Sequence, residues 1–411
     1  MLRLISNIKG LALAIAQPIA QLAGAEMGNW TMLNNAYVLI ENGKILEYGS
    51  MDNCPTFPVD DIVDASGKFV LPAWCDSHTH LVFAQSRETE FVDKIKGATY
   101  AEIAAKGGGI INSALKLRAM SESELYDKAL VRLMTTIQQG TGAIEIKSGY
   151  GLNLESELKM LRIIRRLKEQ NLIPIKASFL AAHALPPEFK DNKAAYIDHI
   201  INDMLPRVAE EGLADYFDVF CEKGFFTVED TDKMLSAAAK YNMPAKIHAN
   251  QLDFSGGVQI GVKHKARSVD HLEHADMAEI EALLGSETMP TLLPSAAFFL
   301  RMNMPQGRKM IDAGLPIALA TDFNPGSSPV SRMSFIISLA CIQMRLLPQE
   351  AIAACTINGA KAMDLEHLVG SVTPGKLANL ILTQPMNDIA FLPYNMGSDS
   401  HEKVLIGENW F

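Results

Sequence analysis

The chain has 411 residues, of which 48% are hydrophobic and 20% are charged, as in an ordinary globular protein. Its length exceeds the usual size of a single domain, so we expect one large domain and a smaller one. With a formal net charge of −10 and no long run of lysine or arginine, nucleic acid and acidic membrane surfaces are not expected partners. The five scattered cysteines have no Cys-x-x-Cys spacing, which argues against a disulfide framework and favours a reducing cytoplasm.

The first 24 residues combine early positive charge with an apolar stretch, as a secretion signal does. Gln17, Pro18 and Gln21 interrupt the apolar part, and no compact charged segment precedes it, so we do not expect a signal peptide. No stretch of the chain reaches the roughly 20 apolar residues that a membrane-spanning helix needs.

Short extended segments characterise both ends of the chain. Residues 36–49 consist of two extended runs joined by Glu-Asn-Gly-Lys, which predicts a β-hairpin. Residues 365–384 also consist of short extended segments, separated by Gly370, Pro374 and Gly375. Because chain termini often lie close together, we expect residues 1–65 and 362–411 to form one small β-sandwich domain.

The middle of the chain, residues 66–361, alternates short apolar runs with helical stretches, which is typical of a parallel sheet with crossover helices. Residues 153–172 are expected to be one such helix, because leucine and isoleucine share a stripe and Asn153 can cap the start. Eight apolar runs could be strands: residues 69–80, 142–150, 175–184, 216–222, 245–251, 268–274, 288–295 and 316–324. Eight strands in a segment of this size predict a (β/α)8 barrel. A doubly wound open sheet is the alternative, but no Gly-x-Gly-x-x-Gly follows a strand.

Polar residues fall at one end of these apolar runs. Seven of the eight runs begin apolar and finish with a reactive side chain: His78 and His80, Lys147 and Tyr150, His183, Glu222, His248, His271 and His274, and Asp322. In a β/α barrel the carboxyl ends of all strands open at one face, where active sites are built. These side chains are therefore expected to meet.

A pair such as His78-x-His80 is weak alone, because two strand-end histidines also occur without a metal. Within the set above it becomes part of a cluster. Three imidazoles and a carboxylate suit zinc or iron(II), so we predict His78, His80, His248 and Asp322 as ligands. Such an ion activates water and polarises a carbonyl, which favours hydrolysis.

Other titratable residues are assigned structural roles. His199, His264, His367 and His401 lie in helical or surface stretches, and His274 lies past the end of its strand. Glu222 could bind a second metal or cap the following turn. Lys147 is expected to form a buried ion pair rather than to act as a nucleophile.

Seven segments together resemble a known family over nearly the whole length of the chain. They are DSHTHLVFAQSRETEF (76–91), GATYAEIAAKGGGI (97–110), IKSGYGL (146–152), AAHALPPEF (181–189), IHANQL (247–252), DHLEH (270–274) and TDFNPGSS (321–328). The order of histidines and aspartate over the strands is similar to that of the amidohydrolase superfamily. Within it, the segments closely resemble the imidazolonepropionases of histidine degradation.

The resemblance implies hydrolysis of 4-imidazolone-5-propanoate to N-formimidoyl-L-glutamate, with one zinc or iron (Fe²⁺ or Fe³⁺) on the four predicted ligands. Carried over to this sequence, the family's substrate contacts are Arg87, Tyr150, His183, Gln251, Asn324, Gly326 and Ser327. Tyr100, beside the glycine run 107–109, is also expected to contact the substrate from a loop that covers the site, although an ordinary flexible connection is the alternative. Superfamily members commonly form homodimers, so a homodimer is expected here.

The residues also fit an anionic substrate on chemical grounds. Arg87 can hold the propionate carboxylate through two hydrogen bonds, although pairing with Glu88 or Glu90 is the alternative. Glycines flank Tyr150 and let the backbone approach a ligand closely. The Asn-Pro-Gly-Ser-Ser segment offers N–H groups and hydroxyls to the propionate end.

A mechanism follows from these assignments. Activated water would attack the ring carbon of the cyclic amide, with His183 or His271 stabilising the oxyanion. Asp322 would carry the water's proton to the leaving nitrogen. Gln251 stands where some family members have Glu as a candidate base, so the base here is expected to be Asp322 or His271. Ser77 replaces a common Pro, and no lysine suited to carbamylation lies on the fourth strand, which favours a single metal.

Two other functions remain open from the sequence. Guanine or cytosine deaminases and dihydroorotase-like enzymes share the metal ligands but lack Ser-Gly-Tyr-Gly-Leu and Asn-Pro-Gly-Ser-Ser at these places. A metal-binding or structural barrel without activity is the alternative outside the enzymes.

Overall fold

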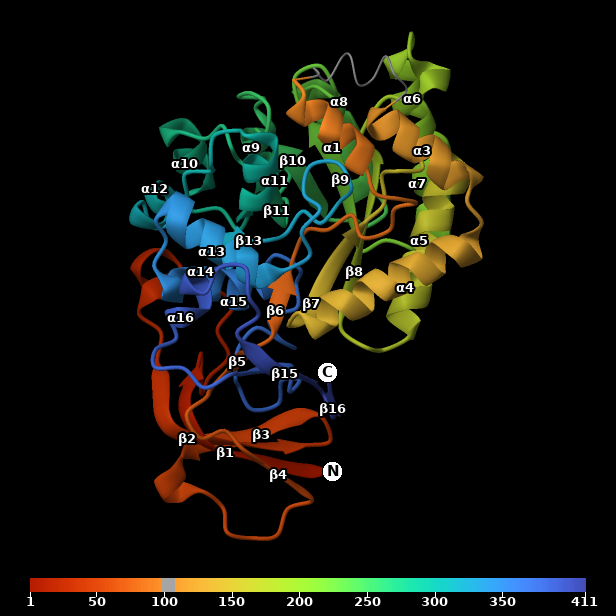
Figure 1. The fold of residues 1–411 in the computed structure, drawn as a ribbon. Helices are drawn as coiled ribbons and strands as arrows, with labels where there is room; N and C mark the ends of the chain where they lie inside the picture. The colour runs from red at the N-terminus through yellow and green to blue at the C-terminus, as the bar shows by residue number, and fades with distance from the viewer. Residues whose placement is uncertain (98–107) are drawn as a thin grey trace.

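The structure is a computed structural model that describes residues 1–97 and 108–411. A barrel with surrounding helices forms the larger part, and a smaller β sheet lies beneath it (Figure 1). The barrel strands are β6 (Trp74–Asp76), β7 (Thr141–Lys147), β8 (Ile175–Ala182), β9 (Tyr216–Cys221), β10 (Ala245–Ala249), β11 (Ser268–His271), β12 (Met289–Leu292) and β13 (Ala318–Leu319). All eight predicted runs contribute a strand, which confirms the (β/α)8 class.

Neighbouring barrel strands pair in parallel from β6 through to β13. The two outer strands meet through contacts that extend past their ends. Buried Asp76 accepts the Thr321 N–H at 3.0 Å, and the His80 N–H donates to the Phe323 carbonyl at 2.9 Å. The barrel is thereby closed beside the residues that follow β6 and β13.

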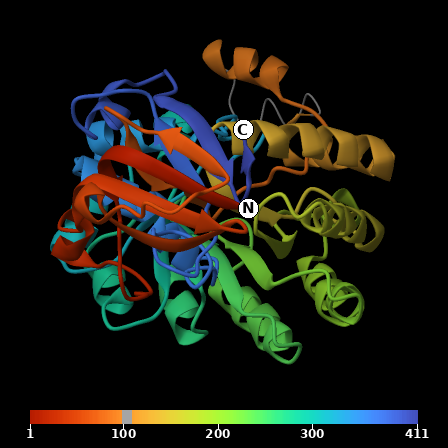
Figure 2. The ribbon, with the colours of Figure 1, turned by 90° about the horizontal axis from the view of Figure 1, so that it is seen from below.

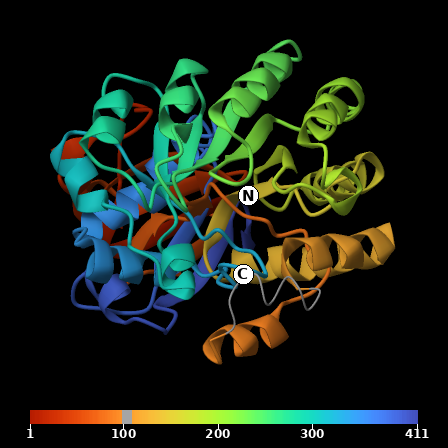
Figure 3. The same ribbon diagram turned by 90° about the horizontal axis from the view of Figure 1, so that it is seen from above.

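Helices surround the barrel, as the view from above shows (Figure 3). They are α1 (Glu88–Ile95), α3 (Gly109–Ala119), α4 (Glu122–Gln138), α5 (Leu154–Glu169), α6 (Lys193–His199), α7 (Leu205–Glu210), α8 (Val228–Ala239), α9 (Gly257–Lys263), α10 (Met277–Leu283), α11 (Pro294–Leu300), α12 (Gly307–Asp312), α13 (Met333–Met344), α14 (Pro348–Cys355), α15 (Ile357–Lys361) and α16 (Phe391–Tyr394). Short 3-10 and π turns occupy Gly24–Gly28, Met51–Asn53, Pro187–Phe189 and Ile200–Met204.

Helix α5 shows how the sequence produces these elements. The Asn153 side chain accepts the Ser156 N–H at 2.9 Å and so caps the helix start, as predicted. Leu158, Leu161 and Ile164 are fully buried against the barrel strands on one stripe. Burial of such a stripe, at about 25 cal/mol per Å² of apolar area, holds the helix on the barrel.

The small sheet combines both ends of the chain, as expected. Its strands are β1 (Leu2–Ala12), β2 (Met32–Glu41), β3 (Lys44–Ser50), β4 (Asp61–Asp64), β5 (Phe69–Pro72), β14 (Leu380–Thr383), β15 (His401–Ile406) and β16 (Asn409–Trp410). They form one hydrogen-bonded sheet with its own apolar core. The termini lie side by side, and the N-terminal amine is 3.4 Å from a Glu408 carboxylate oxygen (Figure 2).

Two details of this sheet differ from the sequence-based expectation. Residues 2–12 lie within the predicted 1–65 segment, but no particular strand is predicted for them, and they form the central strand β1. The apolar run 69–80 is divided, because β5 pairs with β1 and β14 while β6 enters the barrel. The division into a small domain (residues 1–65 and 362–411) and a barrel domain (residues 66–361) stays a prediction. Strand β5 follows residue 65 and yet lies in the small sheet. Within the described residues, no helix is long and apolar enough to cross a membrane.

Candidate metal-binding active site

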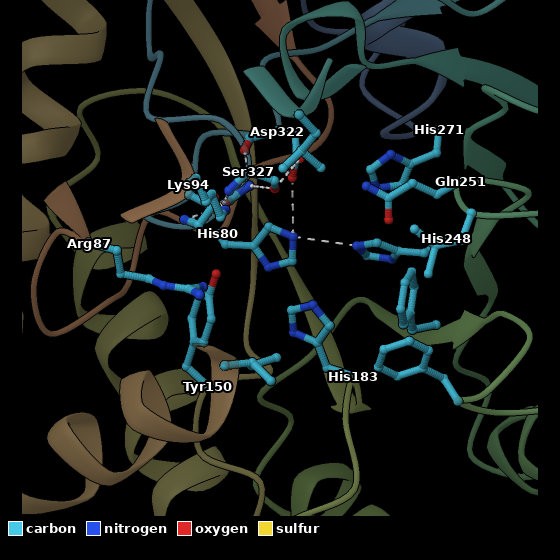
Figure 4. A pocket seen from close by; sticks show the side chains of 17 residues that line it. His80, Arg87, Lys94, Tyr150, His183, His248, Gln251, His271, Asp322 and Ser327 are labelled. Atoms are coloured by element: carbon cyan, nitrogen blue, oxygen red, sulfur yellow. Dashed lines mark hydrogen bonds and ion pairs between the residues drawn. The ribbon is translucent and has the colours of Figure 1, made fainter. Parts of the chain in front are cut away.

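Four buried side chains converge at the carboxyl ends of the barrel strands. His78 Nε2 and His80 Nε2 each lie 3.5 Å from Asp322 Oδ1. His248 Nε2 lies 3.4 Å from His80 Nε2, and Figure 4 shows His80 between Asp322 and His248. Each of the four side chains is at most 3% exposed. Among the described residues, two groups of mutually close metal-binding atoms share His78: one contains His80 and Asp322, the other His248 and His271.

Carboxylates behind the histidines determine which ring nitrogen carries hydrogen. His78 Nδ1 donates to Asp270 at 2.6 Å, and His248 Nδ1 donates to Asp218 at 3.2 Å. A carboxylate can only accept, so Nε2 of each ring presents its lone pair to the cluster. Burial lowers the pKa of His78 and His80, and the neutral imidazole is the form that binds metal.

This donor set fits a metal ion. Among the described residues, the buried His78 Nε2 has no hydrogen-bond partner, although Asp322 lies near it. Lone pairs that face one another at about 3.5 Å repel unless a cation lies between them. Nitrogen and carboxylate donors with carboxylate-oriented histidines are typical of zinc or iron sites.

Lys147 joins the two orienting carboxylates, and the prediction that it forms a buried ion pair is confirmed. Its Nζ lies 2.7 Å from Asp218 Oδ2, 2.6 Å from Glu145 Oε1 and 3.6 Å from Asp270 Oδ2, and all four side chains are fully buried. Lys147, Asp218 and Asp270 come from β7, β9 and β11, alternate strands that contribute one layer of a barrel interior.

Replacing Lys147 with methionine is expected to weaken metal binding about 10- to 100-fold, because the carboxylates that orient His78 and His248 lose their shared cation. The unpaired carboxylates also cost about 3–5 kcal/mol of stability. Zinc titration against a chromophoric chelator measures the first effect. Lys176→Met, which removes a surface strand lysine paired with Asp215, is the matched control. Equal zinc affinity in the two variants would contradict the orienting role.

Asp322 and His271 have backbone conformations that non-glycine residues rarely adopt. Their φ angles are +52° and +88°, and each such residue costs on the order of 1–3 kcal/mol. Asp322 is held there by Ser327 Oγ, which donates to its Oδ2 at 3.2 Å, and by the Asn324 amide, which donates to its carbonyl at 2.6 Å. With these backbone conformations, both side chains line the pocket.

A cavity of about 450 Å³ opens above the donor cluster. Arg87, Lys94 and Tyr150 line the side opposite His271 and Gln251 (Figure 4). The Arg87 guanidinium pairs with Glu90 at 2.5 Å, which is one of the two alternatives predicted for it, and it also faces the pocket. The cavity therefore has a cationic end and a metal-binding end, suited to a small anion.

The loop after β13 forms one wall of this cavity. The Asn324 side chain accepts the N–H groups of Gly326 and Ser327 at 2.7 and 2.8 Å, which fixes the turn. A side chain at Gly326 would collide with the Arg87 guanidinium, so the guanidinium would have to shift to accommodate it. These contacts bring the Asn-Pro-Gly-Ser-Ser segment against the cationic end.

Glu157 holds the segment that carries Tyr150. Its buried carboxylate accepts the N–H groups of Gly149, Gly151 and Leu152 at 3.1, 2.7 and 2.8 Å. Gly149 has a φ of +107°, and a side chain at Gly151 would meet the backbone of Glu157. The Ser-Gly-Tyr-Gly-Leu pattern therefore reflects a loop wrapped around one carboxylate at the start of α5.

Replacing Glu157 with glutamine is expected to release at least one of these N–H groups and to destabilise the fold by about 1–3 kcal/mol. It should also raise KM, because Tyr150 loses its fixed position. Thermal unfolding and steady-state kinetics measure the two effects. Glu155→Gln, in the same helical turn but exposed, is the control. If the variant has the melting temperature and KM of wild type, Glu157 is not needed to hold the loop that carries Tyr150.

Comparison with known proteins identifies the family. The amidohydrolase family model matches residues 69–400. The imidazolonepropionase of Flavobacterium johnsoniae is 53% identical over 406 residues, covering 99% of both chains. That of Clostridium tetani is 42% identical over 385 residues, covering 93% of this chain and 92% of its own. The chain belongs to the amidohydrolase family.

Solved amidohydrolase-like structures share the fold. Escherichia coli guanine deaminase aligns with a TM-score of 0.75 at 14% identity, covering 100% of this chain and 98% of its own. A triazine hydrolase variant aligns with a TM-score of 0.75 at 15% identity, covering 99% and 93%. The amidohydrolase family is metal-dependent, and the histidine–aspartate cluster of this member is the place where a metal can bind.

Most predicted site residues of this amidohydrolase line one cavity. They are His80, Arg87, Tyr150, His183, His248, Gln251, His271, Asp322, Asn324, Gly326 and Ser327, with His78 directly beneath. Tyr100 lies outside the described residues. Glu222 accepts the Gln251 N–H at 2.5 Å. It belongs to none of the potential metal clusters among the described residues. Both observations agree with a carboxylate that caps the turn rather than one that binds a second metal.

The histidines assigned structural roles lie away from the cluster. His199 bonds Asp203, His264 bonds Asp232, and His401 bonds the Gln138 carbonyl. The His274 backbone bonds Asn250 in the turn after β11.

Sequence reasoning missed the orienting residues Asp218 and Asp270, the loop anchor Glu157, and Lys94 at the cavity wall. Asp218 and Asp270 stand in the middle of apolar strands, and such charges are buried only when paired. That pattern could have identified them.

Proposed function

We propose that this chain is an imidazolonepropionase, which hydrolyses 4-imidazolone-5-propanoate to N-formimidoyl-L-glutamate. Water adds across the cyclic amide: the ring bond between carbonyl carbon and nitrogen breaks, hydroxyl goes to carbon and a proton goes to nitrogen. As a step of histidine degradation, the reaction would occur in the cytoplasm. A homodimer remains an expectation drawn from the superfamily.

The observation that carries this proposal is the identity of 51–53% over nearly the full length with relatives named imidazolonepropionase. The shape and charge of the cavity support it independently. Arg87 at one end suits the propionate carboxylate, and the donor cluster at the other end suits the amide.

We assign His78, His80, His248 and Asp322 as ligands of one zinc or iron ion per chain. An ion held there would polarise the amide carbonyl and make water nucleophilic near neutral pH. Asp322 would accept the proton of the attacking water and deliver it to the leaving ring nitrogen. Gln251 has no such capacity, because an amide does not accept a proton at neutral pH.

Two histidines take different roles in this proposal. His183 Nδ1 lies 3.1 Å from the Gly149 carbonyl, which only accepts, and burial lowers the pKa of His183 to about 3. A neutral ring of this tautomer offers Nε2 as an acceptor, so His183 would receive a ring N–H of the substrate. Although burial opposes it, the charge of Glu273 raises the pKa of His271 to about 9. His271, rather than His183, is therefore the donor to the developing oxyanion.

Tyr150, Gln251, Asn324, Gly326 and Ser327 complete the proposed substrate site. Asn324 and Ser327 support the loop beneath the carboxylate, and Tyr150 closes the wall beside Arg87. Tyr100 is assigned to the same site from the sequence alone, through the glycine-rich loop expected beside it.

The test is turnover of a small panel with purified protein. We expect loss of the ultraviolet absorbance of imidazolone propionate, faster than its spontaneous decay, and no ammonia release from guanine or cytosine. Ring opening of dihydroorotate instead, or ammonia release, would replace this proposal with a rival amidohydrolase activity.

A further inference from the structure

Lys94 occupies the cationic end of the cavity but belongs to none of the assigned groups. It lies on α1, seven residues after Arg87 and therefore two helical turns along the same face. Both side chains line the cavity (Figure 4). The Lys94 Nζ donates to the Gly326 carbonyl at 3.2 Å and lies 5.9 Å from the Phe299 ring centre. Its ammonium group is thus held beside the loop that follows Asp322.

Among residues 1–97 and 108–411, no ion pair neutralises the charge of Lys94. Within the described ranges, no carboxylate oxygen lies within 4 Å of its Nζ. Glu90, the acid nearest in sequence on this face, uses Oε2 for Arg87 and Oε1 for the Gly109 N–H. Burial and the charge of Arg87 both lower the pKa of Lys94, although Glu90 opposes this. Among the residues that the structure describes, Arg87 and Lys94 thus share one glutamate at this end of the cavity.

We propose that Lys94 is a second cationic ligand for the substrate carboxylate, acting together with Arg87. This inference rests on the proposed function, since it names the residue that binds the propionate end. An ammonium group has three hydrogens, and the Gly326 carbonyl takes one of them. The others can be donated to an anion that lies between the guanidinium and the 324–327 loop. Arg87, already engaged by Glu90, then shares the carboxylate rather than holding it alone.

The test compares Lys94→Met with wild type on imidazolone propionate and on its propanamide, which keeps the ring but carries no charge. With the carboxylate we expect KM to rise about tenfold at nearly unchanged kcat, the loss typical of one partly exposed charge-assisted hydrogen bond. With the propanamide the variant and wild type should have equal KM. Lys94→Arg should recover most of the loss, and Lys96→Met, an exposed lysine on the same segment, should behave as wild type.

Each other outcome has a defined meaning. If Lys94→Met raises KM equally for carboxylate and propanamide, or raises neither, Lys94 is not a carboxylate ligand. An unchanged melting temperature in the same samples excludes misfolding as the cause of a rise, and Lys94→Gln provides a second variant that keeps a polar group. Failure of wild type itself to open the ring would overturn the proposed function, and this inference with it.

Discussion

Replacing His248 with alanine is expected to remove bound metal and activity together. His248 Nε2 is one of three imidazole donors at the cluster, and its Nδ1 is hydrogen-bonded to Asp218. The variant loses a ligand and leaves a buried carboxylate without its partner. Turnover should fall by about a thousandfold or more, equivalent to about 4 kcal/mol of transition-state stabilisation. Elemental analysis and steady-state kinetics on the same preparation measure both losses.

His264→Ala is the matched control, because it removes a partly buried imidazole that is bonded to Asp232 and does not line the cavity. It should keep full metal content and rate. If His248→Ala retains close to one metal ion per chain, the proposed ligand set is wrong.

Replacing Asp322 with asparagine should separate metal binding from proton transfer. The amide keeps an oxygen near His78 and His80 and can still bond Ser327, so we expect most of the metal to remain. It cannot accept a proton, however, and loss of a general base typically costs 10²–10⁴-fold in rate. We expect kcat to fall about a thousandfold at similar metal content.

Asp253→Asn, a surface carboxylate paired with Lys223, controls for the chemical change. Undiminished turnover in Asp322→Asn with metal retained would exclude Asp322 as the proton carrier. Although burial opposes it, Glu273 raises the pKa of His271, the other candidate base from the sequence, so we do not expect His271 to replace Asp322 as the base.

The barrel and its reactive end could be predicted because local patterns specify them. Each strand is an apolar run that ends in a polar residue, and parallel strands in a barrel bring those ends to one face. His78, His248 and Asp322 are far apart in the chain, yet strand order alone predicts that they meet. The capping residue Asn153 and the apolar stripe likewise predict helix α5 from the sequence.

What the sequence could not specify depends on distant partners. The hydrogen bond from His78 to Asp270 joins residues 192 positions apart, and nothing in the sequence around either residue indicates that they pair. The sequence places Glu157 in a helix but gives no sign that its carboxylate organises the loop before that helix. The division of the run 69–80 between two sheets follows from pairing with β14 at the far end of the chain.

The same limit applies to Lys94. Its helical spacing from Arg87 was visible, but only the contact with Gly326 shows that α1 brings it to the cavity. Contacts of this kind become visible when two segments that are distant in sequence are folded together.

The central claim is that this chain opens the imidazolone ring at a metal centre built from His78, His80, His248 and Asp322. The most direct measurement is the initial rate of imidazolone propionate loss by chelator-treated protein, before and after one equivalent of zinc or iron(II) is restored. We expect a rate near spontaneous decay without metal, and full activity with N-formimidoyl-L-glutamate as product at one ion per chain. Full activity in metal-free protein, or no activity after either ion is restored, would contradict the claim.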